Sequence, residues 1–271
     1  MKKALLWMVL AMGIAVACTQ QKPKMAATGS SVKTDSVGCV IKKQGIEIAI
    51  STDYPTEAEA LQQGLSAFIE EQMVLDDSLD IFPTADGQQV MQLLAEAKFK
   101  DIKSMLGGEQ EDGEAVQEEK ADPSSTYKAD YKRAYETDDY ISFQGYWNSY
   151  VEGTAHPNDG YCGITLRKSD GKPLGLTDIL KNTNGPKFRE QLKEGIKKWL
   201  FDITESESMT DEDMKQILGE QFTPDSIPLP ESAPFLLEEG VALPYASYEL
   251  LPQASGIIVI PYDADYSVLK P

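Results

Sequence analysis

The chain has 271 residues and carries 44 acidic against 25 basic side chains, a formal net charge of −19. This balance argues against nucleic acid and anionic membrane surfaces as partners, and it favours either a cationic protein partner or simply high solubility. The single histidine, His156, excludes multi-histidine zinc sites, and no CxxC pair or Gly-rich phosphate loop occurs. We therefore expect no metal and no cofactor.

Residues 1–17 have the pattern of an export signal. Lys2 and Lys3 precede an apolar run over residues 4–17, which is too short to span a bilayer comfortably. The run ends in Ala-Val-Ala directly before Cys18, the small-residue pattern that a lipoprotein signal peptidase requires. We predict a lipid on Cys18 and a location in the cell envelope, as a periplasmic or outer-membrane lipoprotein. An ordinary secretory signal that happens to contain a cysteine is the alternative.

The next two segments are predicted as a flexible tether (residues 18–38) and an N-terminal α+β region (residues 39–152). The tether is rich in Gln, Lys, Ser, Thr and Gly, and has few large apolar residues. Alternating isoleucines predict one strand over residues 40–52, and helical periodicity predicts helices over residues 55–74 and 86–106. An acidic stretch over residues 109–123 is predicted to be a solvated loop.

Two aromatic-rich strands close the N-terminal region. Residues 127–135 and 140–150 alternate in polarity around a Glu-Thr-Asp-Asp turn, which predicts an antiparallel hairpin with one aromatic-lined face.

The C-terminal region (residues 153–271) is predicted to continue with a strand, a helix over residues 186–201 and a short helix that begins at a capping box at Thr210. Residues 257–260 are apolar on both faces and are predicted to be central in a sheet. Helices and strands occur in blocks without βαβ alternation, so we expect an α+β fold with two lobes of mainly antiparallel sheet packed with helices.

Cys39 and Cys162 are the cysteines that remain after the leader. An even pair in an oxidising compartment predicts a disulfide between them. Two unpaired buried thiols, or one reactive thiol, are the alternatives.

Two ordered motifs carry a family resemblance. The loop Gly153-Thr154-Ala155-His156-Pro157 is followed by a strand, a Gly-Lys turn and Leu-Thr-Asp-Ile-Leu. A closing pattern follows at Phe235, Gly240, Tyr245, Tyr248, Glu249, Leu250, Gly256, Pro261, Tyr262 and Leu269. Residues 153–271 thereby resemble the extracytoplasmic domain shared by the anti-sigma factor RsiV and the peptidoglycan deacetylase PdaC, known as domain of unknown function 3298. Residues 39–152 show a weaker, PdaC-like resemblance.

The resemblance implies a recognition domain and not a catalyst, because this domain binds lysozyme in RsiV and accompanies a separate catalytic domain in PdaC. We expect a non-enzymatic, lipid-anchored protein that binds an extracytoplasmic protein such as lysozyme, or a cell-wall glycan. An envelope hydrolase that acts on peptidoglycan or polysaccharide through paired carboxylates is the alternative, since 44 acidic residues neither identify nor exclude a pair.

Aromatic residues and the lone histidine are the candidate ligand contacts. His156 either contacts the ligand or fixes its loop through a hydrogen bond to the backbone. The candidate ligand-binding residues are Tyr146, Trp147, His156, Asn158, Tyr245 and Tyr248.

Overall fold

The computed structural model describes residues 31–73, 86–107, 123–205, 208–219, 222–252 and 254–262. The predicted leader, Cys18 and most of the predicted tether lie outside these residues, as does nearly all of the predicted acidic loop. None of the helices within these ranges combines the length and the apolar character needed to cross a bilayer.

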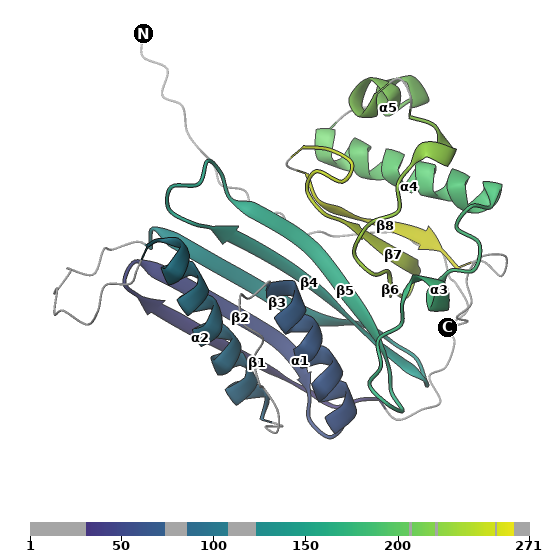
Figure 1. Cartoon of the computed structure of the whole chain (residues 1–271). Helices are drawn as coiled ribbons and strands as arrows, with labels where there is room; N and C mark the ends of the chain where they lie inside the picture. The colour runs from purple at the N-terminus through teal and green to yellow at the C-terminus, as the bar shows by residue number, and fades with distance from the viewer. Residues whose placement is uncertain are drawn as a thin grey trace, which may run out of the picture.

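Two β-sheets, each packed with helices, divide the chain into two lobes (Figure 1). The first lobe holds a five-stranded sheet in the order β1-β2-β3-β4-β5. Its strands are β1 (Thr34–Lys43), β2 (Ile46–Pro55), β3 (Ser125–Glu136), β4 (Tyr140–Tyr150) and β5 (Asn158–Arg167). All pairings are antiparallel except β2 with β3. The prediction of an α+β fold with mainly antiparallel sheets is confirmed.

Two helices, α1 (Glu59–Met73) and α2 (Gly87–Met105), connect β2 to β3 and lie on one face of the sheet (Figure 1). A parallel pair of strands needs such a long crossover connection. Every second residue of β2, namely Ile46, Ile48 and Ile50, is buried on this face. Burying each of these side chains contributes about 1.5–3 kcal/mol. The alternation that predicted a half-buried strand therefore identifies the core of the first lobe.

The single strand predicted over residues 40–52 is in fact two strands. β1 and β2 meet at Gln44 and Gly45, whose φ angles of 53° and 74° both lie in the left-handed region. Two successive positive φ angles form the type I′ turn that suits a two-residue hairpin. The hairpin also corrects the predicted boundary at residue 38, because residues 34–38 belong to β1 and not to a tether.

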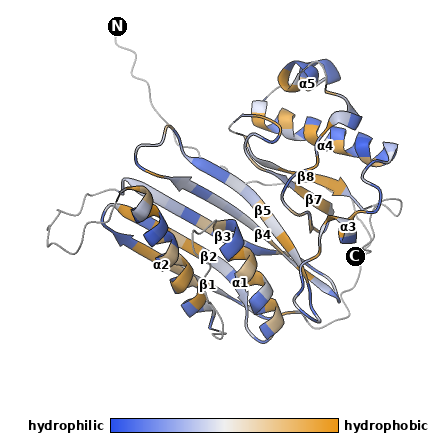
Figure 2. Cartoon of the chain, viewed as in Figure 1, coloured by the Kyte–Doolittle hydropathy of each residue, from blue (hydrophilic) through white to orange (hydrophobic). Residues whose placement is uncertain are grey.

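The second lobe holds the antiparallel strands β6 (Phe235–Leu236), β7 (Gly240–Tyr245) and β8 (Gly256–Pro261). Its helices are α3 (Leu176–Ile179), α4 (Pro186–Thr204), α5 (Asp211–Leu218) and the 3-10 turn η1 (Pro224–Ser226). β7 and β8 are largely hydrophobic in Figure 2, and every residue of β7 is buried. Among the described strands the central one is therefore β7, and the prediction that residues 257–260 occupy the centre was wrong: β8 lies at the edge of these three strands and its burial alternates.

The two lobes meet where β6 packs on β4 and β5. Phe235 lies directly on Gly163, and the Leu236 N–H donates to the Thr165 hydroxyl at 2.9 Å. β5 pairs with β4 along its whole length, so the predicted boundary between residues 152 and 153 cuts through the first sheet. The lobes divide after β5, because a strand belongs with the strands to which it is hydrogen-bonded.

The predicted disulfide is not formed, and Cys39 and Cys162 are both free thiols. Cys39 lies on β1 and Cys162 on β5, the two edge strands of the first sheet. Four strand spacings of about 4.8 Å separate these edges by about 19 Å. A disulfide needs Cα atoms about 4.4–6.8 Å apart, so the fold keeps the two thiols well beyond bonding distance.

Candidate functional site

Within the part of the chain that the structure describes, one face of the five-stranded sheet carries no helix. α1 and α2 cover the face onto which the buried isoleucines of β2 point. Because successive side chains of a strand point to opposite faces, the residues that alternate with these isoleucines point to the other face. We call this surface the open face. It is formed by Val40, Lys42, Glu47, Ala49, Ser51, Lys128, Asp130, Lys132, Tyr146, Asn148, Asp159 and Tyr161. None of these residues is buried.

The register of the strands aligns the open face in rows that run across the sheet. One row joins Ser51, Asp130, Tyr146 and Tyr161. The Ser51 hydroxyl donates to the Asp130 carboxylate at 2.6 Å, so this row is hydrogen-bonded at one end. The rows place polar and aromatic side chains from four strands side by side, which sequence order alone does not reveal.

Ion pairs neutralise most of the charge on the open face. Glu47 lies 3.1 Å from the Lys128 ammonium and 3.9 Å from that of Lys42. Asp130 lies 3.1 Å from the ammonium of Lys132. Exposed pairs of this kind add little to stability. Their consequence here is a nearly charge-balanced surface on a chain whose net charge is −19.

Two tyrosines form the aromatic end of the open face. The rings of Tyr146 and Tyr161 have centroids 5.0 Å apart and planes tilted by 48°. The Tyr146 hydroxyl lies 3.5 Å from Asp159, at the outer limit of a hydrogen bond. Burial, followed by the nearby charge of Asp159, raises the pKa of the Tyr146 hydroxyl above its ordinary value.

The second lobe borders this aromatic end. The Ser255 hydroxyl, just before β8, donates at 3.2 Å to the same oxygen of Asp159 that faces Tyr146. Asp159 is thus an acceptor for hydroxyl donors from both lobes. The sequence reasoning missed Asp159 and Ser255. Asp159 lies two residues before Tyr161 and so shares a face of β5 with it, which could have indicated Asp159 as a site residue. No local signal in the sequence connects Ser255 with β5.

The structure separates the predicted ligand-binding residues. Tyr146 lies on the open face and is 40% exposed. Trp147, the next residue, lies on the opposite face, where it packs against the core and covers Gly160. Asn158 is exposed at the first position of β5 and shares the side of Trp147. Only Tyr146 of these three contributes to the open face.

His156 lies in the exposed loop between β4 and β5. Its Nδ1 atom is 3.0 Å from the carbonyl oxygen of Pro157, the next residue. This contact within the loop is the backbone hydrogen bond expected of a loop-fixing histidine.

The two C-terminal tyrosines have opposite environments. Tyr245 is buried, and its hydroxyl donates to the Pro228 carbonyl at 2.7 Å. Tyr248 is exposed in a left-handed conformation with a φ of 74°. Tyr245 therefore holds the second lobe together, and only Tyr248 is accessible to a ligand.

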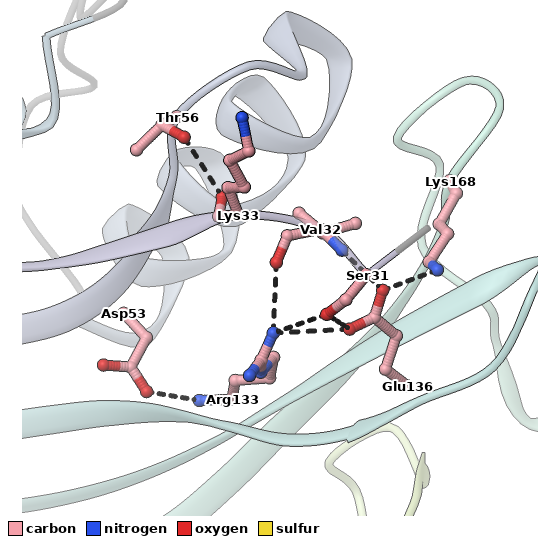
Figure 3. Close-up of polar contacts among 8 residues, drawn as sticks. All are labelled: Ser31, Val32, Lys33, Asp53, Thr56, Arg133, Glu136 and Lys168. Carbon is pink, nitrogen blue, oxygen red and sulfur yellow. Dashed lines mark hydrogen bonds and ion pairs between the residues drawn. The ribbon is translucent and has the colours of Figure 1, made fainter. Parts of the chain in front are cut away.

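A second polar cluster surrounds Glu136 at the end of β3 (Figure 3). Its carboxylate accepts hydrogen bonds from Lys168 at 2.6 Å, from the Val32 N–H at 2.7 Å and from the Ser31 hydroxyl at 3.0 Å. Arg133 also donates to this carboxylate, at 3.3 Å. Burial acts to raise the pKa of Glu136, but these hydrogen bonds outweigh it, and the pKa lies below its ordinary value. The cluster fixes the start of the described chain to the sheet.

A polar cavity of about 380 Å³ lies beside this cluster, in the turns that follow β3 and β5. Its lining residues are Asp138, Asp139, Tyr140, Arg167, Lys168 and Ser169. Over the described ranges, no group of three or more His, Cys, Asp or Glu residues is placed to hold a metal ion.

Comparison with known proteins identifies structures of similar fold. A DUF3298 family protein from Pseudomonas aeruginosa PAO1 superposes with a TM-score of 0.56 at 18% identity, covering 86% of this chain and 92% of that one. A member of the DUF3298 family from Bacteroides fragilis NCTC 9343 gives a TM-score of 0.59 at 18% identity, covering 88% of this chain and 92% of that one. No protein-family model and no curated protein matches the chain. Both lobes together thus have the fold seen in structures of the DUF3298 family.

Proposed function

We propose that the protein is a lipid-anchored protein of the cell envelope whose two lobes form a non-catalytic recognition domain. Its ligand is an extracytoplasmic molecule, either a cationic protein such as lysozyme or a cell-wall glycan. The observation that carries the proposal is the open face. It combines rows of polar side chains with an accessible tyrosine pair beside the second lobe.

The composition of the open face suits recognition better than simple solvation. An antiparallel sheet often exposes one polar face to water. Here the face also exposes two large side chains with apolar surface, since Val40 is 69% and Tyr146 40% exposed. Binding surfaces combine apolar and aromatic contacts with a few placed polar groups. The RsiV-like motifs in residues 153–271 support the same kind of function.

The pattern at residues 15–18 supports the lipid anchor. Metabolic labelling with an alkyne-bearing fatty acid tests it directly. We expect label on the full-length protein and none on the Cys18→Ala variant. Unlabelled wild-type protein would overturn the anchor without affecting the recognition domain.

Ligand recognition is tested with the full-length protein in detergent. It is titrated against lysozyme at low and moderate salt, and it is co-sedimented with purified peptidoglycan. The Ala49→Tyr variant places a bulky side chain at the centre of the open face. Leu93→Tyr adds the same side chain at an exposed position of α2, on the other side of the lobe.

We expect saturable binding to one of the two ligands, with Ala49→Tyr weakening it and Leu93→Tyr leaving it unchanged. Binding to neither ligand, or equal binding by both variants, would contradict the proposal. Release of soluble sugar from the peptidoglycan would instead support the hydrolase alternative.

A further inference from the structure

We infer that the open face binds a neutral oligosaccharide, with one sugar ring seated on the Tyr146–Tyr161 pair and its hydroxyl groups bonded to Asn148 and Asp159. The inference rests on the proposed recognition role of the open face and specifies the class of ligand.

The charge on the open face favours an uncharged ligand. The chain as a whole is strongly acidic, but Glu47 and Asp130 are already paired with lysines. A cationic protein that docked here would have to compete with those lysines, and it would bring its own positive charge close to Lys128. A neutral, polar ligand meets no such repulsion.

The remaining carboxylate, Asp159, already has hydroxyl groups as neighbours. The hydroxyls of Tyr146 and Ser255 both lie near one oxygen of this side chain, at 3.5 Å and 3.2 Å. An ionised carboxylate can accept about four hydrogen bonds. Asp159 therefore has acceptor capacity for the hydroxyl groups of a sugar, which are chemically the same type of donor.

The tyrosine pair supplies the apolar platform. Tyr146 is 40% exposed, so part of its side chain is not covered by the rest of the lobe and is accessible to a ligand. An aromatic ring presents an electron-rich face, which attracts the polarised C–H groups on the face of a sugar ring. Sugars need such a surface because they combine an apolar ring face with polar edges.

The polar groups flank this platform at a suitable spacing. Asn148 and Asp159 face each other across β4 and β5, in the row next to Tyr146 and Tyr161. Residues two apart on a strand are separated by about 6.8 Å. The amide of Asn148 offers both donors and an acceptor. A sugar ring that stacks on the two tyrosines therefore lies, on one side, within hydrogen-bonding reach of Asn148 and Asp159.

The full-length protein in detergent is titrated by calorimetry with chitotetraose, a neutral oligosaccharide, and separately with lysozyme. Titrations with cellotetraose and maltotetraose test whether binding depends on the acetamido group and on the glycosidic linkage of the oligosaccharide. The variants are Tyr146→Ala, Tyr146→Phe and Asp159→Asn. Phe201→Ala removes an aromatic side chain that is 39% exposed on α4, outside the open face, and is the matched control.

We expect saturable binding of at least one oligosaccharide, with Tyr146→Ala weakening it at least about tenfold. Tyr146→Phe keeps the aromatic ring and should stay within about threefold of wild type, as should Phe201→Ala. Asp159→Asn should weaken binding without changing the thermal unfolding midpoint by more than a few degrees.

Lysozyme binding without oligosaccharide binding would overturn this inference and leave the proposed function intact. Absence of both would overturn both. Oligosaccharide binding that is unchanged in a folded Tyr146→Ala variant would also overturn the inference, because the sugar would then lie elsewhere.

Discussion

Tyr245 shows how one hydroxyl group can be structural although its sequence context suggested a ligand contact. The side chain is buried and its hydroxyl donates to the Pro228 carbonyl, which joins β7 to the segment after η1. We predict that Tyr245→Phe lowers the free energy of unfolding by about 1 kcal/mol, because the carbonyl loses its donor. Urea unfolding measures this, with exposed Tyr248→Phe as the control. Unchanged stability of Tyr245→Phe would contradict the role.

Glu136 gives the fold an acid-sensitive contact. Its folded-state pKa lies below the ordinary value of 4.5, so the unfolded chain takes up the proton first. The contribution of Glu136 is therefore fully present above about pH 4.5 and is lost as the pH falls through the lower, folded-state pKa.

We predict that Glu136→Gln costs about 1–2 kcal/mol at pH 7 and that the loss shrinks on acidification below pH 4.5. Denaturant unfolding at several pH values provides the measurement. Glu57→Gln, which removes an exposed ion pair with Lys33, is the control and should have a small effect at every pH. A loss that is independent of pH would show that the charge of Glu136 is unimportant.

At the scale of elements, the order of the strands decides the state of the cysteines. Because β1 and β5 are the two edges of one sheet, Cys39 and Cys162 remain apart and reduced. Burial raises the pKa of Cys162 to about 12, whereas Cys39 is only partly buried. The thiolate is the reactive form, so the two cysteines differ in reactivity.

We predict that the Cys18→Ser protein, isolated without reductant, shows two thiols in denaturant. In the native state, Cys39 should react with a thiol reagent much faster than Cys162. Mass spectrometry of the labelled peptides separates the two sites. A linked peptide containing both cysteines would contradict the order of the strands.

At the scale of the whole molecule, the contact between the lobes depends on a glycine. A Cβ atom at Gly163 would lie 2.2 Å from the Phe235 ring, far inside contact distance. We predict that Gly163→Ala destabilises the protein by about 1–3 kcal/mol and exposes the connection between the lobes to protease. At Gly175 a Cβ meets its nearest atom at 3.7 Å, so Gly175→Ala is the control. Equal melting and proteolysis of the two variants would refute this contact.

Local patterns in the sequence were sufficient to predict the type of most helices and strands. The isoleucine alternation in β2 and the helical periodicity of α1, α2 and α4 gave the correct element types, since burial on one side imposes a period of two or 3.6. The β1–β2 turn escaped prediction because Gln44-Gly45 is a weak turn signal beside Asn-Gly or Asp-Gly.

The sequence by itself determined the α+β class and the position of an aromatic strand around Tyr146. Only the tertiary structure decided which face of that strand is accessible, which is why Trp147 packs against the core and Tyr146 lies on the open face. Alternation states that neighbouring residues point to opposite sides, but the covered side depends on where distant helices pack. The same long-range packing brings Ser255 to Asp159 and keeps Cys39 from Cys162.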